Sequence, residues 1–280
     1  MTIELIDTHT HFDVSDYDMT RDMLTKRAYD VGVRHLLLIG LTAKNFERML
    51  KVHKLVSNQQ LVQAHLAFGL HPLYIFEHCD EDLSMLDAYL SAHQNIAISE
   101  IGLDTFDKSL AIPEIFAKQE RFFIEQIKLA QSHDLPIILH IRKAHGRALQ
   151  ILKAQKYSAK ALGGIAHSFS GGEQEALAFV KMGFKLGITG QITNPNAKKL
   201  RRVVMMLFRQ FGTSPFVIET DCPDMMPVPC QHQGFLNEPA NLTYVLDELA
   251  VLFKMDKEVL ARQLWQNTNE ALRQNWIYKS

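Results

Sequence analysis

The chain has 280 residues, 47% hydrophobic and 22% charged, a composition that excludes a disordered protein. Its 30 lysines and arginines balance 31 aspartates and glutamates, so no global field steers it onto nucleic acid or an anionic membrane. Three scattered cysteines exclude a disulfide framework or a thiolate zinc site, and no apolar stretch approaches the ~18 residues of a membrane-spanning helix. We expect a protein of the reducing cytoplasm, neither exported nor membrane-embedded.

Short β-rich runs alternate with longer amphipathic stretches, which is typical of βαβ units around a parallel sheet. The strands are expected at residues 4–8, 35–40, 62–69, 96–102, 136–140, 164–167, 184–188 and 216–221. Between them, apolar residues recurring at three and four predict helices at 21–31, 45–56, 81–93, 113–134 and 173–182. A proline-rich loop, 222–239, then precedes two helices at 240–253 and 256–275.

No linker, repeat or low-complexity tract divides the sequence, so we expect a single domain over residues 1–280. Eight β/α units favour a closed TIM (β/α)8 barrel, a fold that commonly takes roughly 250 residues. A doubly wound open sheet with eight strands is the alternative.

The end of the first predicted strand carries two histidines, His9 and His11, two residues apart. In a strand, that spacing aims both rings to the same side. Imidazole is the commonest metal ligand in proteins, so the pair is a candidate chelate for one divalent ion. Asp7, one step earlier on the same face, is expected to hydrogen-bond to the pair from beneath. Two histidines fall short of a full metal site, and further ligands must come from elsewhere in the chain.

Other metal-capable side chains fall at the carboxyl ends of later strands, where barrel enzymes build their active sites. Glu100 closes the fourth strand, His140 the fifth, His167 the sixth and Asp221 the eighth. Each alone is commonly a structural histidine or a helix cap, but several matching placements together predict one site. Glu219 lies one step deeper than Asp221 and is expected to support the site rather than bind metal.

Four imidazoles and two carboxylates exceed the needs of one ion and suit two ions bridged by a carboxylate. Glu100 is the natural bridge. We assign one ion to His9, His11, Glu100 and Asp221, and the second to Glu100, His140 and His167. Nitrogen and oxygen ligands admit Zn²⁺, Mn²⁺, Co²⁺ or Mg²⁺, and the choice stays open.

Seven sequence motifs, spread over nearly the whole chain, resemble those of a known protein family. They are Asp7-Thr8-His9-Thr10-His11, Gly69-Leu70-His71-Pro72, Ser99-Glu100-Ile101-Gly102-Leu103-Asp104, Pro136-Ile137-Ile138-Leu139-His140, His167-Ser168-Phe169-Ser170-Gly171, Glu219-Thr220-Asp221-Cys222-Pro223 and Asn237-Glu238-Pro239. In this order they resemble the TatD-type metal-dependent deoxyribonucleases, within the amidohydrolase-like barrels. The resemblance implies a two-metal phosphodiesterase with the same six ligands, and some such relatives are 3′ to 5′ exonucleases on DNA.

Two departures from that family pattern bear on the substrate. Lys143-Ala144-His145 stands where relatives often carry an acidic residue, and Phe235 and Leu236 stand where a basic residue often precedes Asn-Glu-Pro. Neither departure affects the six predicted metal ligands. The departures fit a subgroup of TatD-like hydrolases without an assigned substrate as well as they fit a dedicated DNase.

Three further features bear on catalysis and substrate binding. We expect Asp221 to accept a proton from the attacking water, as a catalytic residue beside the bridging Glu100. His71 is either a turn histidine before proline or a donor to a phosphate oxygen, and Arg142 is a candidate phosphate clamp. The basic run at residues 198–202 is either a solvated face or a track for a nucleic-acid backbone.

The leading expectation is therefore a metal-dependent phosphodiesterase with DNA or a nucleotide as substrate. A barrel hydrolase for a lactone, cyclic amide or phosphotriester is the second reading, although such relatives commonly bridge their metals with a strand-four lysine, and Ser99-Glu100-Ile101 contains none. A non-catalytic metal-binding barrel is the third. The oligomeric state stays open, and a monomer is compatible with the sequence.

Overall fold

The eight predicted strands are all present in a computed structural model that describes residues 3–233 and 236–279. They are β1 (Leu5–Thr10), β2 (Val33–Ile39), β3 (Gln63–Ala67), β4 (Ile98–Asp104), β5 (Ile137–Arg142), β6 (Gly164–Ala166), β7 (Lys185–Ile188) and β8 (Phe216–Ile218). Neighbouring strands run parallel, in the order β1-β2-β3 and β4-β5-β6-β7-β8. Phe235, one of the departures from the family pattern, lies outside the described residues.

Backbone hydrogen bonds join the two strand groups into one closed barrel. Between β8 and β1, the Asp221 amide donates to the His9 carbonyl at 2.9 Å and the His11 amide to the Cys222 carbonyl at 2.8 Å. Between β3 and β4, the Ser99 amide donates to the Phe68 carbonyl at 3.0 Å. The structure therefore confirms the TIM barrel, and the open sheet is excluded.

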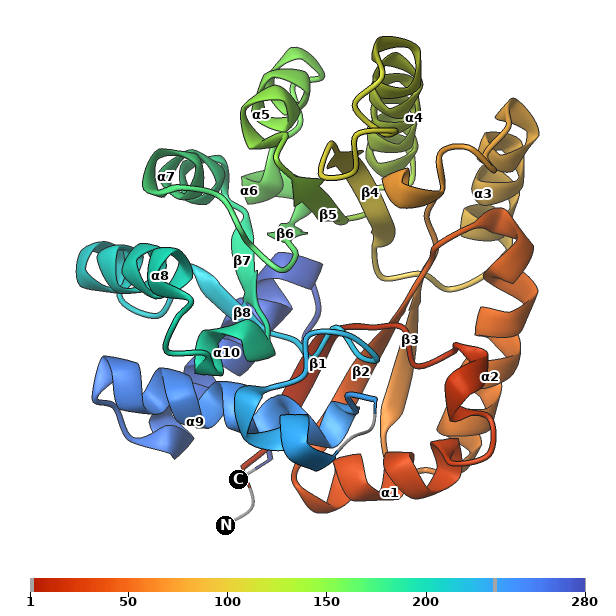
Figure 1. Cartoon of the computed structure of the whole chain (residues 1–280). Helices are drawn as coiled ribbons and strands as arrows, with labels where there is room; N and C mark the ends of the chain where they lie inside the picture. Colours follow the sequence, from red (N-terminus) through yellow and green to blue (C-terminus); the bar gives the residue numbers. More distant parts are fainter. Residues whose placement is uncertain (1–2, 234–235, 280) are drawn as a thin grey trace.

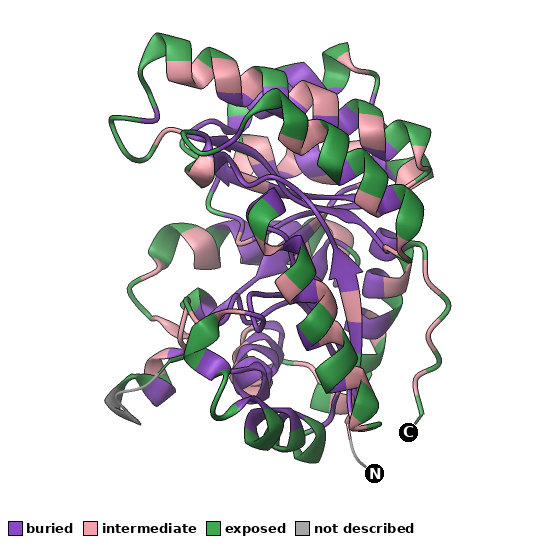
Figure 2. Ribbon diagram, turned by 90° about the vertical axis from the view of Figure 1, so that its right-hand side faces the viewer, coloured by how far each residue is buried: buried purple, intermediate pink, exposed green. Residues whose placement is uncertain are grey.

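Helices surround the barrel, with their outer faces exposed and the strands inside them buried (Figures 1 and 2). They are α1 (Arg21–Asp30), α2 (Phe46–Asn58), α3 (Asp80–Ala92), α4 (Pro113–Ser132), α5 (His145–Ala154), α6 (Ala159–Leu162), α7 (Glu173–Met182), α8 (Lys198–Phe211), α9 (Leu242–Phe253) and α10 (Lys257–Leu272). Short 3-10 helices follow some strands, among them η3 (Pro72–Tyr74) and η4 (Gly190–Thr193). Within the described residues, none of the helices combines the length and hydropathy needed to cross a bilayer.

β2, β3, β6 and β8 end earlier than the sequence predicts, and after β6 and β8 the backbone turns at the barrel mouth. Ser168 and Asp221 have φ values of 41° and 56°, in the left-handed region that ends extended pairing. β6 therefore stops at Ala166 and β8 at Ile218, before the polar residues that follow them. These turns place His167 and Asp221 on the rim rather than in the sheet.

A glycine allows the close approach of backbones that positions Glu100. A Cβ at Gly69 would lie 2.4 Å from the Ser99 carbonyl oxygen and 2.9 Å from the Glu100 nitrogen, so no larger residue fits. The Glu100 amide also donates to the Gly40 carbonyl at 3.0 Å. The seam between β3 and β4 thus fixes the start of the Glu100 side chain at the centre of the mouth.

The opposite end of the barrel is covered by the C-terminal segment, which packs on a histidine pair. His35 Nδ1 lies 2.9 Å from His65 Nε2, so one ring must be neutral and accept the hydrogen bond. The Trp276 ring stacks on both, with centroids 4.3 Å from His35 and 4.5 Å from His65. Burial lowers the pKa of His35 to about 4, aided by Arg34, and that of His65 to about 3.

This pair is expected to make stability depend on pH. The unfolded histidines bind protons below pH ~6.5, whereas the folded ones resist protonation until pH ~4, so the free energy of unfolding falls by a few kcal/mol across that interval. The stabilisation is fully present above pH 6.5. Urea unfolding at pH 7.5 and 5.0, followed by tryptophan fluorescence, measures the loss. His65→Gln should show a smaller loss than the wild type; equal losses would contradict the assignment to this pair.

Candidate metal centre

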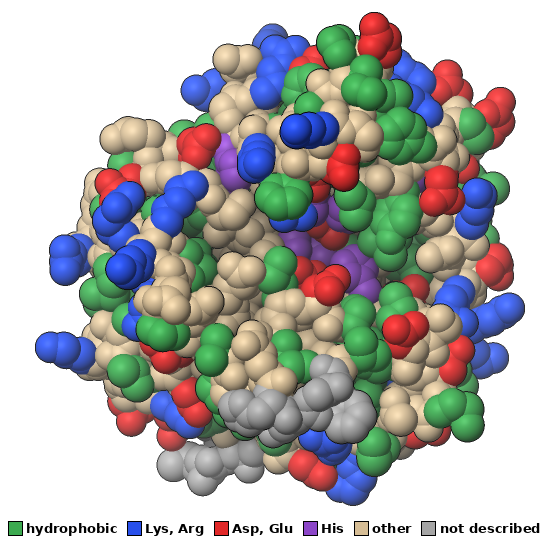
Figure 3. Space-filling model, viewed as in Figure 1, with side chains coloured by type: hydrophobic (Ala, Val, Ile, Leu, Met, Phe, Trp, Pro, Cys, Tyr) green, Lys and Arg blue, Asp and Glu red, His purple; other side chains and the backbone are tan. Residues whose placement is uncertain are grey.

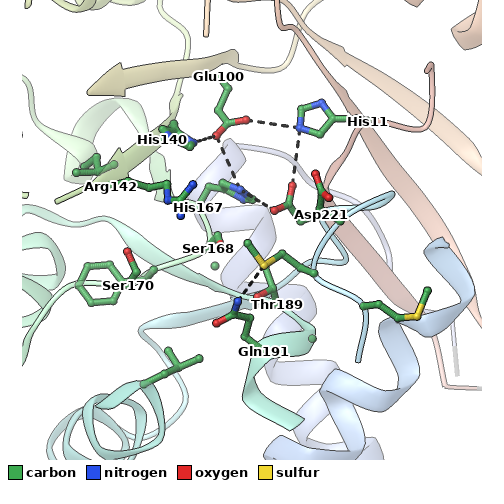
Figure 4. Close-up of a pocket in the computed structure, with 18 of the residues that line it drawn as sticks. His11, Glu100, His140, Arg142, His167, Ser168, Ser170, Thr189, Gln191 and Asp221 are labelled. Carbon is green, nitrogen blue, oxygen red and sulfur yellow. Dashed lines mark hydrogen bonds and ion pairs between the residues drawn. The ribbon is translucent and has the colours of Figure 1, made fainter. Parts of the chain in front are cut away.

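A cavity of about 990 Å³ opens at the carboxyl ends of the strands and is lined by five of the six predicted ligands. The sixth, His9, is fully buried beside it. Figure 3 shows histidine and acidic side chains on its floor, with lysine, arginine and apolar side chains around its rim. The six expected ligands come from five strands or from the turns that follow these strands. In sequence order they are His9, His11, Glu100, His140, His167 and Asp221. Figure 4 shows the five that line the cavity turned toward one another, and His9 joins them through donor groups with His11 and Glu100 and with His167 and Asp221.

One oxygen of the buried Glu100 carboxylate faces the histidine pair of β1. Glu100 Oε2 lies 3.1 Å from His9 Nε2 and 3.6 Å from His11 Nε2. The two rings stand edge to face with centroids 5.2 Å apart, and both present Nε2 to the same point. The spacing of two residues therefore aims both imidazoles to one side, as expected.

The other oxygen of Glu100 faces a second set of imidazoles. Glu100 Oε1 lies 2.6 Å from His140 Nδ1 and 3.3 Å from His71 Nε2. His167 Nε2 is more distant, at 3.8 Å. Because each oxygen is turned toward a different histidine group, Glu100 could contribute a ligand atom to each of two ions.

Asp221 and His167 complete the rim on the side of β6 and β8. Asp221 Oδ1 lies 3.8 Å from His9 Nε2 and 3.7 Å from His11 Nε2, and Asp221 Oδ2 lies 3.4 Å from His167 Nε2. His167 is thus closer to Asp221 than to Glu100, and its ring stacks on His9 with centroids 3.4 Å apart. The partition of the six ligands between two ions stays a prediction.

His71 lies inside the cluster, and its hydrogen bonds define its role. Its Nδ1 accepts the Leu73 amide at 2.9 Å, so in the neutral ring the proton sits on Nε2, the nitrogen that faces Glu100. Burial lowers the pKa of His71 to about 4, which keeps the ring neutral at pH 7. A protonated Nε2 is a hydrogen-bond donor and not a metal ligand.

Two carboxylates hold the histidine ligands from behind. Asp104 Oδ2 lies 2.9 Å from His140 Nε2, and Glu219 Oε1 lies 2.9 Å from His167 Nδ1. Such partners fix the ring orientation and raise the basicity of a histidine ligand. The sequence predicted this support for Glu219 but missed Asp104. The signal was its position four residues after Glu100, on the same face of a strand.

Asp7 supports the site in a different way from the one expected. Its Oδ1 accepts the Thr220 amide at 2.9 Å and the His9 amide at 3.4 Å, and Thr220 Oγ1 donates to its Oδ2 at 2.6 Å. The expected bond to the histidine rings is therefore wrong, because the carboxylate is used in joining the backbones of β1 and β8. Burial raises the Asp7 pKa to about 8.

The charges in the cavity depend on one another. Burial alone would raise the pKa of the Glu100 carboxyl, but the surrounding histidines hold it well below its usual range. Burial would likewise lower the pKa of His140, yet Glu100 and Asp104 raise it to about 9. His9 is held neutral because burial and the charge of His167 lower its pKa. The cluster thus combines fixed negative charge with imidazole.

The donor set fits divalent cations. Ligand atoms that share one ion at about 2.0–2.2 Å lie roughly 3–4 Å apart, and the separations of 3.1–3.8 Å around Glu100 Oε2 and Asp221 match this. Two groups of donor atoms lie within 4.8 Å of one another: His9, His11 and Glu100; His9, His167 and Asp221. A third group of the same kind joins Glu100 and His140 to His71, whose Nε2–H makes it a hydrogen-bond donor rather than a ligand. Imidazole and carboxylate without thiolate suit Zn²⁺, Mn²⁺, Co²⁺ or Mg²⁺.

The remaining predicted substrate contacts divide between the cavity and the outer surface. Arg142 lines the cavity, as do Lys198 and Lys199 at the start of α8. The other two cations of the basic run are paired elsewhere, Arg201 with Glu248 at 2.6 Å and Arg202 with Glu173 at 2.8 Å. The run is therefore not one continuous track.

Comparisons with known proteins agree with this geometry. Residues 6–273 match the family described as TatD related DNase. An uncharacterised metal-dependent hydrolase, YjjV of Escherichia coli (strain K12), is 35% identical over 271 residues, covering 96% of this chain and 97% of its own. The crystal structure of the TatD homologue YjjV from the same bacterium superimposes with a TM-score of 0.85 at 33% identity, covering 97% of this chain and 98% of the other.

A relative with a named activity is more distant. The 3′-5′ ssDNA/RNA exonuclease TatD of Pantoea sp. (strain At-9b) is 28% identical over 280 residues, covering 96% of this chain and 99% of its own. The similarity extends over the whole barrel in each case, so it includes every strand that contributes to the cavity.

Proposed function

This chain belongs to the family of TatD-related DNases and is a metal-dependent hydrolase, and from this premise we propose that it hydrolyses phosphodiester bonds of DNA with two divalent ions. Support comes from the exonuclease name of a relative that matches along the whole chain. The three free cysteines are consistent with our proposal that the enzyme works in the reducing cytoplasm.

One observation supports a phosphodiester as the bond that is hydrolysed. The two oxygens of Glu100 face separate histidine groups, Oε2 toward His9 and Oε1 toward His140. Two bridged ions are suited to displacement at phosphorus, where charge develops on both the attacking and the leaving oxygen. When bound, such ions lower the pKa of water and stabilise charge on phosphoryl oxygens.

The protein side chains then have distinct roles. Asp221 accepts a proton from the attacking water. Burial alone would raise the pKa of its carboxyl, but the charge and hydrogen bond of His167 lower it, so the carboxylate is ionised and can take up a proton. The Nε2–H of neutral His71 faces Glu100 Oε1 at 3.3 Å, and in the substrate complex it donates to a phosphoryl oxygen instead. Asp104 and Glu219 keep the rings of His140 and His167 in place.

An activity screen tests this proposal. Protein purified without a metal-affinity tag is analysed for metal, then assayed with Mg²⁺, Mn²⁺ and Zn²⁺ on single-stranded DNA, on bis(4-nitrophenyl) phosphate and on a lactone panel. We expect metal-dependent cleavage of both phosphodiesters, with a ladder of DNA products, and loss of activity with chelator. Turnover of lactones without phosphodiester cleavage would assign the barrel to a different bond.

A further inference from the structure

An exposed aromatic ring packs against two cations, one of which lines the cavity. Phe106, in the loop after β4, is 54% exposed although it is a large apolar side chain. The Arg142 guanidinium lies 3.9 Å from the centre of its ring, and Lys143 Nζ lies 4.6 Å from it. Arg142 also lines the cavity, two residues beyond His140 on β5.

The ring orients these cations without neutralising them. Among residues 3–233 and 236–279, no carboxylate lies within ion-pair distance of Arg142 or Lys143. A carboxylate partner would cancel the positive charge, whereas a stacked ring leaves the in-plane N–H groups of a guanidinium free for a bidentate contact with phosphate. Within the described residues neither cation is therefore neutralised by an ion pair, and Arg142 is the one that lines the cavity.

The ring is fixed to the metal centre through a short chain of hydrogen bonds. The Phe106 amide donates to Asp104 Oδ1 at 2.7 Å, and Asp104 Oδ2 lies 2.9 Å from His140 Nε2. The Thr105 amide donates to the Arg142 carbonyl at 3.1 Å, which ties the loop to the end of β5. Phe106 and Arg142 thus hold a set position relative to the predicted ligands.

A second pair of cations lines the cavity from another strand end. Lys198 and Lys199 begin α8, which follows β7, and Lys199 Nζ donates to the Ser170 carbonyl at 2.8 Å. The cavity that these lysines and Arg142 line also contains five of the six predicted ligands. A small ester with one reacting group cannot contact cations at two separate places on the rim. A chain of phosphates can contact both.

We propose that Phe106 is a positioning residue that holds Arg142 and Lys143 to bind a phosphate next to the scissile one, so that the substrate is an oligonucleotide rather than an isolated phosphodiester. This inference rests on the proposed phosphodiesterase activity. According to this proposal, the preference for a long substrate depends on Phe106, a residue that lies outside all the motifs that contain the predicted ligands.

The test compares two substrates that differ in the number of phosphates. The kcat/KM of the metal-loaded enzyme is measured for an eight-residue oligothymidylate and for bis(4-nitrophenyl) phosphate, and their ratio is reported for each variant. We expect Arg142→Met to lower the ratio about tenfold and to reduce the salt dependence of the oligonucleotide rate by roughly 0.7 in slope. Phe106→Leu, which keeps an apolar side chain but removes the ring, should lower the ratio about threefold.

Rescue and control variants make the test specific. Phe106→Trp should restore the ratio, because tryptophan is the stronger partner for a cation. Arg262 is stacked on Tyr278, with 4.8 Å to the ring centre, outside the cavity, so Arg262→Met removes the same charge and should leave the ratio unchanged. If wild-type enzyme cleaves both substrates and Arg142→Met keeps the wild-type ratio, the flanking site is wrong while the phosphodiesterase stands. If the wild type cleaves neither, both proposals fail.

Discussion

Replacing Glu100 by glutamine is expected to reduce phosphodiester hydrolysis by at least about 10³-fold. The carboxylate is 1% exposed and each of its oxygens faces a different imidazole group. Glutamine keeps the volume but removes the negative charge and replaces one acceptor oxygen with an NH₂ donor. The variant therefore loses the group that joins the two halves of the donor set, and its metal content should fall with its activity.

Glu219→Gln is the matched control for that experiment. Glu219 is as buried as Glu100 but contacts His167 at Nδ1, the nitrogen that faces away from the cavity, so it supports one ligand without bridging. Loss of such a partner typically costs about 10–100-fold. Elemental analysis, kcat and thermal unfolding of both variants separate the roles. Equal metal content and activity within tenfold of wild type in Glu100→Gln would refute the bridge.

The meeting of the six predicted ligands at one end of the barrel was predictable, because the order of strands in a parallel barrel fixes which side chains come together. Each of His140, His167 and Asp221 follows a short β-rich run, and the carboxyl ends of parallel strands must meet at one end of the barrel. The period of two along a strand was enough to place His9 and His11 on one side. Local pattern and topology together thus predicted that these side chains meet, while their role as metal ligands stays a prediction.

Contacts between side chains from different strands could not be predicted from the sequence. The bond between Asp104 and His140 depends on the register of β4 against β5, in which Asp104 is paired with Arg142. The same register brings the loop that carries Phe106 beside Arg142. A shift by one residue would move these side chains to the other face, and nothing in either strand alone specifies it.

Ion-pair partners that are distant in the sequence also determine which basic side chains of the run at residues 198–202 remain free to bind a substrate. Glu248 and Glu173, which pair with Arg201 and Arg202, lie 47 and 29 residues away from them in the sequence. A run of basic residues therefore contains both neutralised and free cations, and only the packing of α8 against its neighbours separates them. The overlap of Trp276 with His35 likewise depends on the path of the C-terminal segment across the barrel.

Replacing Asp221 by asparagine is expected to lower kcat by about 10²- to 10⁴-fold while the barrel stays folded. Asparagine has the same size and accepts the left-handed backbone of this position, where φ is 56°, so the main-chain bond from residue 221 to the His9 carbonyl survives. What it lacks is the capacity to take a proton. Metal content, kcat and thermal unfolding are measured together, because a lost ligand and a lost base both slow the reaction but only the first changes metal content.

Asp224→Asn provides the comparison within the same loop. Asp224 also lines the cavity, but within the described residues its carboxylate forms no ion pair with a histidine, so its replacement should cost far less activity than that of Asp221. Because both changes remove one negative charge from one cavity, a general electrostatic effect would lower the two rates alike. A selective loss in Asp221→Asn therefore identifies the proton acceptor, and full activity with unchanged metal content in that variant would rule the role out.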